Sequence, residues 1–415
     1  MTLIKTSLLN GIAVIIKMMT LLGINKVLAL YVGPSGYAAL GQFQNVIQVV
    51  TTFSTGAITT GVTKYTAEHH QDEALQHAVW RTAGTITLIL TFMSAIFLVG
   101  FKDVLAVWLL NDQALSGVFI WFSMSLIFSV LNALLCAILN GKKEIKLYVV
   151  ANIAGSIFAL VSVIALSVQW GLYGALVALA VYQSLSFFVT FFLVTRTNWF
   201  RLSYIFGGID SKISRDLAKF AAMALASAVC VPVSHILIRN HLGESLGWDY
   251  AGYWEAMWRL SSAYLMFITM TLSVYYLPRL SELSDRKDLQ REILDGYKII
   301  LPAAVFCSSI VYLSRSFLID LLFSPEFSEM GHLFFWQMVG DTLKIASWIL
   351  AYVLIAKAYW KVYVFAEVII SSLFYFLVYF FVDVLGVEAT AIAHAVCYLL
   401  YFIFLGVALR LKNTI

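Results

Sequence analysis

The sequence predicts an all-α polytopic membrane protein with twelve transmembrane helices in two parallel six-helix lobes. The first observation is composition: mean hydropathy is +0.87, and only 12% of residues are charged, whereas soluble domains carry about 25%. The second is that apolar runs of about 20 residues recur along nearly the whole chain, as transmembrane helices require. The third is an internal repeat that relates the two halves of the chain.

The apolar runs place the helices in order along the chain. We expect them near residues 7–30, 37–61, 79–100, 115–139, 148–168, 172–194, 217–238, 251–276, 297–320, 332–355, 362–382 and 389–409. The first run is not a cleavable signal peptide, because no small-residue cleavage site follows it and the apolar pattern continues. The four cysteines lie inside apolar runs without CxxC or CxH spacing, so we predict packing residues rather than disulfides or metal ligands.

Basic residues in the loops predict the orientation. The loops on one side hold most of them, for example Lys142, Lys143 and Lys146, whereas the opposite loops offer only Lys102 and Arg239. By the positive-inside rule both termini are cytoplasmic. The net charge of +4 mostly reflects this topology, so it gives no reason to expect a nucleic acid as partner.

A short motif repeats in the two halves. KLYVVAN at 146–152 resembles KVYVFAE at 361–367, and the offset between these two motifs also relates Gly171 to Gly386. Six predicted helices separate the copies, so both halves have the same orientation and form parallel repeats about an axis along the membrane normal. We predict lobes at 1–200 and 201–415, with a site between them. No loop is large enough for a separate domain, so function must lie among the helices.

Two lysines in the first span lack a local partner. Lys17 and Lys26 precede every acidic residue of the chain, of which Glu68 is the first. A lysine at mid-bilayer costs about 2.5–3.5 kcal/mol even on the lenient insertion scale. Lys26 lies near a helix end, so snorkelling to the interface is an alternative for it. Lys17 lies deeper, and we predict that it faces a wet cavity that receives an anion.

The second span carries a polar stripe. Its residues recur at three- and four-residue steps and are Gln42, Asn45, Gln48, Thr52, Thr55 and Thr59. Hydrogen bonding between helices, worth about 0.6 kcal/mol per bond, is one explanation. Six polar groups along one face favour a cavity wall.

Later spans contain charged residues of both signs. Glu255 and Arg259 are spaced i, i+4, and Asp341 and Lys344 are spaced i, i+3, so each pair could neutralise itself on one helix. Glu367 has no cation on its own helix and is a candidate protonatable group or partner for a cation. Together with Lys17 and Lys26 the set is positive, which favours an anionic head group. Arginine suits phosphate oxygens through its planar fork.

Catalytic motifs are absent from the sequence. We find no GxSxG, HExxH, P-loop or GxGxxG context, so we predict a secondary-type transporter without a cofactor or metal rather than an enzyme. His235 and His394 lie within spans and are expected to be packed and hydrogen-bonded, with a proton relay as the alternative.

Several ordered motifs carry a family resemblance. Lys26 followed by GPSGY at 33–37, then GVTKY at 61–65, YLMFIT at 264–269 and VGDTLK at 339–344 resemble the bacterial polysaccharide-lipid flippases of the Wzx type. The similarity covers almost the full chain and is strongest to flippases of lipid III and O antigen. It implies the multidrug/oligosaccharidyl-lipid/polysaccharide exporter fold, in which two six-helix lobes open alternately to either membrane face.

The resemblance also implies the substrate and its surroundings. The expected cargo is an undecaprenyl-pyrophosphate-linked oligosaccharide, moved from the cytoplasmic to the periplasmic leaflet of the bacterial inner membrane. The glycan is O antigen or enterobacterial common antigen. Besides membrane lipid, the glycan polymerase of the same pathway is a candidate partner. No cofactor is expected, and coupling to a proton or sodium gradient stays open.

The predicted site combines cations with carboxylate partners. Lys17, Lys26, Arg259 and Lys344 would contact the head group, and Lys64 would receive it at the cytoplasmic mouth. Glu255, Asp341 and Glu367 would hold the cations in place, or titrate if a proton gradient resets the cycle. The polar stripe Gln42, Asn45, Gln48 and Thr52 would line the cavity.

Two alternative functions remain. An antiporter of small organic cations should have a cavity dominated by carboxylates, opposite to the charge found here. A glycan polymerase or ligase would be expected to present a sizeable periplasmic catalytic loop, and the sequence has none.

Overall fold

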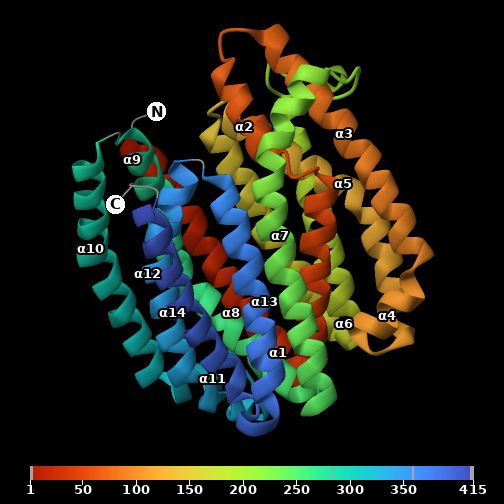
Figure 1. Ribbon diagram of the computed structural model, residues 1–415. Coiled ribbons are helices and arrows are strands. Elements are labelled where there is room, and N and C mark those ends of the chain that lie inside the picture. The colour runs from red at the N-terminus through yellow and green to blue at the C-terminus, as the bar shows by residue number, and fades with distance from the viewer. Residues whose placement is uncertain (1–2, 284, 358, 412–415) are drawn as a thin grey trace. The chain divides into compact units, whose positions relative to one another are not determined.

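The computed structural model describes residues 3–283, 285–357 and 359–411, and no strand occurs within these ranges (Figure 1). Both chain ends, for which we predict a cytoplasmic location, lie outside them. The helices of the first half are α1 (Leu3–Ser54), α2 (Thr59–Glu68), α3 (Glu73–Gly100), α4 (Lys102–Leu110), η1 (Gln113–Ser116), α5 (Gly117–Gly141), α6 (Ile145–Thr195) and η2 (Leu202–Tyr204). Those of the second half are α7 (Ser211–Ser245), α8 (Trp248–Thr271), η3 (Leu272–Tyr276), α9 (Leu277–Glu282), α10 (Arg286–Leu313), α11 (Arg315–Leu322), η4 (Pro325–Leu333), α12 (Phe334–Ala356), α13 (Trp360–Leu385) and α14 (Glu388–Leu411).

Long apolar helices confirm the polytopic all-α class. Within the described residues, eight helices are long and apolar enough to cross a membrane, and their cores lie in α1, α3, α5, α6, α10, α12, α13 and α14. Two of them are bent pairs, because Gly33 (φ 69°) interrupts α1 and Gly171 (φ 56°) interrupts α6. Each pair therefore contains two of the predicted spans. Helix α7 covers the predicted range 217–238, and α8 together with η3 covers 251–276. The total of twelve stays a prediction.

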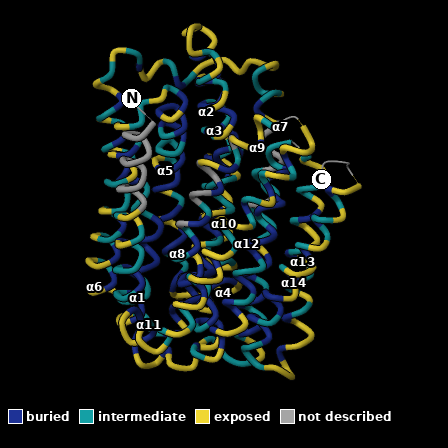
Figure 2. The backbone as a smooth tube through the Cα atoms, turned by 90° about the vertical axis from the view of Figure 1, so that its left-hand side faces the viewer, coloured by how far each residue is buried: buried dark blue, intermediate teal, exposed yellow. Residues whose placement is uncertain are grey.

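Exposed apolar side chains occur along the helices, as expected for contact with lipid. Phe92 on α3, Phe306 on α10 and Phe380 on α13 are each more than 60% exposed. Exposed positions recur along the length of the helices and are not confined to their ends (Figure 2). In water such a surface would be unfavourable, whereas in a bilayer it matches the solvent.

Several predicted boundaries are displaced in the structure, and two of them show the physical reason. The span predicted at 37–61 ends at Ser54, because Gly56 (φ 60°) and Ala57 (φ 50°) take left-handed conformations before α2 begins. The span predicted at 297–320 is α10, which begins at Arg286 after Asp285 caps it by accepting a hydrogen bond from the Lys287 backbone. A charged helical turn is stable in water, so an apolar window does not detect it.

The backbone confirms the internal repeat. Gly171 (φ 56°, ψ −131°) and Gly386 (φ 59°, ψ −147°), which the repeat makes equivalent, share an unusual conformation. The residues that precede α6 and α13, Glu144 and Tyr359, are equivalent at the same offset and have nearly the same backbone angles. A positive φ favours glycine, so the repeat preserves both the bend and the residue type that permits it.

A second glycine pair extends the repeat to the start of each half. Gly33 bends α1, and Gly247 (φ 109°) separates α7 from α8 at an offset only one residue shorter than that between Gly171 and Gly386. The two arms of α1 therefore correspond to α7 and α8. This correspondence allows each charged residue of the second half to be compared with its counterpart in the first.

Side-chain packing follows the same repeat. In the first half the Ser125 hydroxyl donates to the Ala180 carbonyl at 2.9 Å, joining α5 to α6. The equivalent residues of the second half, Gly340 and Ala395, join α12 to α14 so closely that a Cβ on Gly340 would lie 3.0 Å from the Ala395 nitrogen. Figure 1 shows α12 and α14 side by side.

The described chain separates into two compact units. Unit 1 comprises Met1–Val32 and Ala39–Pro232, and unit 2 comprises Gly33–Ala38 and Val233–Ile415. The boundary lies inside α7, later than the predicted seam, because the connection after α6 packs on unit 1. Ile205 joins the core around Trp80, and the Asp210 backbone donates to the Thr82 hydroxyl at 3.1 Å. That residues 1–200 and 201–415 form the two lobes that move against each other during transport stays a prediction.

Candidate functional site

Buried charges gather in unit 2. Among the described side chains, those that are charged and buried are Arg239, Glu255, Arg259, Asp341 and Lys344. They come from α7, α8 and α12. Three buried cations therefore accompany two buried carboxylates. The sum predicted from the sequence also counted Lys17, Lys26 and Glu367, none of which is buried, so it stays a prediction.

Glu255 binds two arginines, one at each carboxylate oxygen. Arg259 donates from Nε to Oε1 at 2.6 Å, so the i, i+4 pair predicted on α8 is formed. Arg239 donates from Nε to Oε2 at 3.0 Å, and its Nη2 contacts the same oxygen. The Arg239 guanidinium also lies over the Trp254 ring at 5.3 Å. One carboxylate thus serves two guanidinium groups, and the triad keeps a positive charge.

The predicted position of Arg239 in an outer loop is wrong. Helix α7 continues to Ser245, and Arg239 is only 2% exposed. The predicted helix stopped at residue 238 because the apolar window ends at the charge. Helical spacing was the missed signal, since His235, Arg239 and Leu242 lie at i, i+4 and i+7 and are all buried.

Arg259 also holds the segment Gly33–Ala38. Its guanidinium lies 4.9 Å from the centre of the Tyr37 ring, within the range of a cation–π contact. The Tyr37 and Phe327 rings pack edge to face at a centroid distance of 5.3 Å. Gly252 on α8 admits the Pro34 carbonyl, since a Cβ there would be 1.9 Å from the oxygen. The GPSGY motif therefore forms the bend of α1, and this bend packs against α8.

Lys344 is enclosed by aromatic rings. Its amine lies 4.6 Å from the centre of the Trp258 ring, 5.0 Å from Trp348 and 5.5 Å from Tyr398. Each ring face attracts a cation, and the attraction strengthens when water is excluded. The rings stabilise the ammonium group without neutralising it, so it can still attract an anion.

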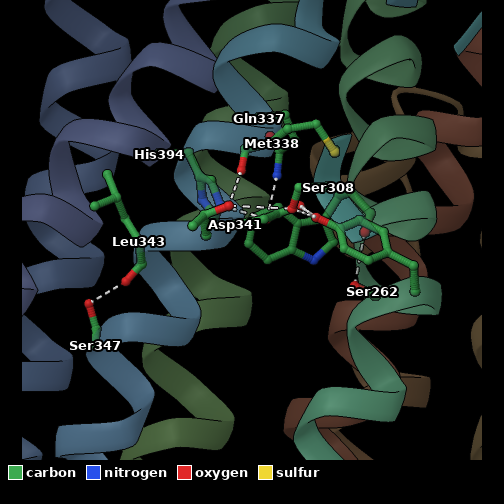
Figure 3. Close-up of polar contacts among 11 residues, drawn as sticks. Ser262, Ser308, Gln337, Met338, Asp341, Leu343, Ser347 and His394 are labelled. Carbon is green, nitrogen blue, oxygen red and sulfur yellow. Dashed lines mark hydrogen bonds and ion pairs between the residues drawn. The ribbon is translucent and has the colours of Figure 1, made fainter. Parts of the chain in front are cut away.

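Asp341 is the centre of a hydrogen-bond network (Figure 3). His394 contacts Oδ1 at 3.0 Å, Gln337 donates to the same oxygen at 3.2 Å, and the Tyr264 hydroxyl donates to Oδ2 at 2.7 Å. Asp341 and Lys344, both within the described residues, do not approach within the 4.0 Å of an ion pair, so the i, i+3 pair that the spacing would allow is not formed. The expectation that His394 is packed and hydrogen-bonded is confirmed.

His235 is also packed, against aromatic rings. Its ring centre lies 4.3 Å from Trp258 and 5.2 Å from Trp254. Glu367, the remaining predicted carboxylate, is half-buried on α13. Both residues belong to unit 2, as do Glu255 and Asp341.

The three predicted lysines of the first half belong to unit 1. Lys17 is exposed and Lys26 is half-buried, both on α1. Lys64 on α2 is exposed, pairs with Glu68 at 3.9 Å and lies 5.0 Å from the centre of the Tyr65 ring. Their contact with a head group stays a prediction.

The polar stripe of α1 is divided between packing and exposed positions. Gln42 is fully buried, and Asn45 donates to the Pro232 carbonyl at 3.4 Å. Gln48 is exposed, and Thr52 is half-buried with its carbonyl accepting from the Thr55 hydroxyl at 2.9 Å. That this stripe lines a cavity stays a prediction.

The repeat shows that the charges are specific to unit 2. At the offset that relates Gly33 to Gly247, Arg239 and Arg259 correspond to Asn25 and Asn45. At the offset that relates Gly171 to Gly386, Lys344 corresponds to the buried Ser129. Neutral polar groups therefore occupy the equivalent places in unit 1.

Bent helix pairs in two repeats, with a basic buried network in one of them, define a two-repeat membrane transporter. Known structures share the fold: the inward-facing conformation of a multidrug resistance MATE family transporter of the MOP superfamily has a TM-score of 0.80 at 15% identity, over 96% of this chain and 95% of that one. The lipid II flippase MurJ, in an inward closed conformation, has a TM-score of 0.74 at 14% identity, over 98% of this chain and 87% of that one. At these identities the likeness establishes the fold alone.

Sequence similarity identifies the family. The family described as polysaccharide biosynthesis protein matches residues 3–284. The lipid III flippases of Escherichia coli (strain K12) and Shigella flexneri are each 31% identical to this chain over 406 residues, which cover 97% of both partners in each comparison. The chain belongs to the polysaccharide biosynthesis protein family, and the resemblance to Wzx-type flippases is confirmed.

Proposed function

We propose that this protein is a flippase that moves an undecaprenyl-pyrophosphate-linked oligosaccharide from the cytoplasmic to the periplasmic leaflet of the bacterial inner membrane. Family membership and full-length similarity to proteins named lipid III flippase support this function. The observation that carries it at the site is the excess of buried cation in unit 2. A pyrophosphate head group supplies the anionic charge that this excess lacks.

Arg259 and Lys344 are the proposed phosphate contacts. Arginine offers a planar fork for two phosphate oxygens, and lysine offers a compact charge that several oxygens can share. They are 7% and 8% exposed, so alternating access must uncover them for the head group to bind. Lys17, Lys26 and Lys64 would attract the same group from unit 1, while the polyprenyl tail stays in lipid.

The carboxylates position the cations. Glu255 fixes both arginines, and Asp341 is held by His394, Tyr264 and Gln337. In this proposal Asp341 and Glu367 keep Lys344 charged in the resting protein. They are also the groups that would titrate if a proton gradient resets the cycle.

The membrane arrangement follows from the loop charges. Both termini would be cytoplasmic by the positive-inside rule, and the sequence contains no P-loop that would supply ATP hydrolysis. The glycan polymerase of the same pathway would receive the flipped unit. An organic cation antiporter would require carboxylates in excess, and the buried charges of unit 2 have the opposite balance.

Complementation tests the function. The chain is expressed in a strain that lacks its lipid III flippase and in one that lacks its O-antigen flippase, and surface glycan is measured. We expect one glycan to return, and lipid-linked units to remain on the cytoplasmic face in the empty-vector control. Failure to restore either glycan by a protein shown to be inserted in the membrane would overturn the proposal. In the native strain, deletion of this chain should trap lipid-linked units on the cytoplasmic face. Accumulation of unpolymerised units on the periplasmic face after deletion would favour a glycan polymerase or ligase instead.

A further inference from the structure

We infer that Arg239 is a positioning residue for head-group binding: it occupies one oxygen of Glu255, so that Arg259 keeps its positive charge for the phosphate. The inference rests on the proposed function and deepens it by adding a residue that has no direct part in the predicted site. Its basis is the shared carboxylate, the burial of both arginines and the comparison with the other repeat.

The geometry of the triad sets its charge. Arg259 donates to Oε1 of Glu255 at 2.6 Å, and Arg239 donates to Oε2 at 3.0 Å. Without Arg239, Glu255 and Arg259 would be a neutral ion pair on one helix, and a paired guanidinium has little attraction left for an anion. With Arg239 present, two positive charges share one negative charge.

Burial makes the second arginine costly. Removing a charged group from water costs several kcal/mol unless good partners compensate, and Arg239 is 2% exposed. It contacts the Glu255 carboxylate and the Trp254 ring. The other buried carboxylate of the described residues, Asp341, is engaged by His394, Tyr264 and Gln337. An excess positive charge at this depth is unfavourable in the empty protein and favourable once an anion binds.

The repeat indicates that the fold does not need these charges. At the equivalent places of unit 1 the residues are Asn25, which is 1% exposed, and Asn45. The same helix arrangement is therefore compatible with a buried neutral amide at the position of Arg239. The charge in unit 2 is better explained by binding than by packing.

The arrangement also separates the roles of the two arginines. Arg259 is the more exposed of the two, and the Tyr37 ring fixes its orientation from a second side. Arg239 lies on α7, contacts the second oxygen of Glu255 and acts through that carboxylate. We therefore expect Arg239 to affect the affinity for the head group without touching it.

Charge-balancing variants test the inference. Arg239→Gln leaves a neutral Glu255–Arg259 pair and is expected to lower glycan display per inserted molecule, and the affinity of the purified protein for undecaprenyl pyrophosphate, by about tenfold. The double variant Arg239→Gln/Glu255→Gln restores one positive charge on Arg259 and should recover most of both. Arg239→Lys keeps the charge and should stay within about threefold of wild type. Lys102→Gln removes an exposed cation on α4 and controls for net charge.

The outcomes distinguish positioning from packing. A packing role predicts that the double variant is no better than Arg239→Gln, and that result would overturn the inference. Wild-type affinity and display in Arg239→Gln would overturn it as well. If Arg239→Gln fails to accumulate, the comparison of the double variant and Arg239→Lys with wild type decides, because only the charge mechanism keeps both active. Failure of the wild-type chain to restore any glycan would instead contradict the proposed function.

Discussion

Single residues set the electrostatic character of unit 2. Arg239, Arg259 and Lys344 are all buried. The Glu255 carboxylate stabilises the two arginines, and ring faces stabilise Lys344. Ring faces leave the charge of Lys344 intact, and in the proposed function this charge would attract a phosphate. At the residue scale, we therefore expect these three cations to set the preference for an anionic substrate.

Replacing Lys344 tests its role as a phosphate contact. Lys344→Met fills a similar volume without charge, and we expect glycan display to fall by about tenfold. Lys344→Arg should retain more activity than Lys344→Met, because it keeps the charge among the same rings. Lys361→Gln, at an exposed cation on α13, is the matched control. Equal display by all variants at equal protein levels would exclude a role for Lys344.

Close backbone approach at Gly252 makes a second residue-scale prediction. A Cβ at this position would lie 1.9 Å from the Pro34 carbonyl oxygen, so Gly252→Ala must displace the bend of α1. We expect a loss of about 1–3 kcal/mol in stability, as for overpacked cores. Gly406→Ala on α14 is the control, since nothing lies within 4 Å of its added Cβ. Thermal unfolding of the purified variants should show a lower Tm for Gly252→Ala and no loss for Gly406→Ala.

At the scale of elements, bent helix pairs are the repeated unit. α6 bends at Gly171, and α13 and α14 meet at Gly386 with nearly the same backbone angles. The sequence predicted this relation because the motif that starts at Lys146 and Lys361 recurs at the same offset as the glycine. It also predicted most spans, since an apolar run of about 20 residues has few other structures available in a membrane protein.

Other features could not be predicted from hydropathy. The start of α10 at Arg286 and the break at Ala57 depend on capping and local backbone conformation. Arg239 was misplaced because a charge ends an apolar window, although its helical spacing matches the buried face of α7. The rings around Lys344 come from α8, α12 and α14. Such contacts require the tertiary arrangement, which one sequence does not provide.

The repeated glycines give a prediction at this scale. Gly171→Ala and Gly386→Ala each place a Cβ on a residue with positive φ and extended ψ, a region that costs other residues about 1–3 kcal/mol. We expect similar decreases in Tm for both variants, because the two bends are equivalent. Open space surrounds the added Cβ at both positions, so the loss would come from the backbone alone. Unchanged thermal unfolding in either variant would contradict the assigned conformation of that glycine.

The whole molecule combines two similar units with different charges. Unit 2 holds the buried charged network, and unit 1 holds the predicted lysines of α1 and α2 with neutral groups at the equivalent buried places. Under the proposed function, the two repeats would share an architecture but contribute different groups to the binding of one substrate. The long lipid tail needs no site among the helices, since the bilayer already solvates it.

Charge reversal at Lys26 tests whether unit 1 contributes to transport. Lys26→Glu would repel the pyrophosphate, and we expect glycan display to be lost while the protein remains inserted at the wild-type level. Lys26→Arg keeps the sign and should preserve display. Wild-type display by Lys26→Glu would assign this lysine to the membrane interface and remove it from the site.

The most direct measurement of the central claim is the affinity of the purified protein for undecaprenyl pyrophosphate, with and without the charge of Arg259. Arg259→Gln leaves Arg239 and Glu255 as a neutral pair, so folding should be retained while the excess positive charge of the triad is lost. We predict that the wild-type chain binds this lipid and prefers it to uncharged undecaprenol, and that Arg259→Gln weakens binding by about tenfold or more. Equal affinity of both proteins for the two lipids would contradict the account.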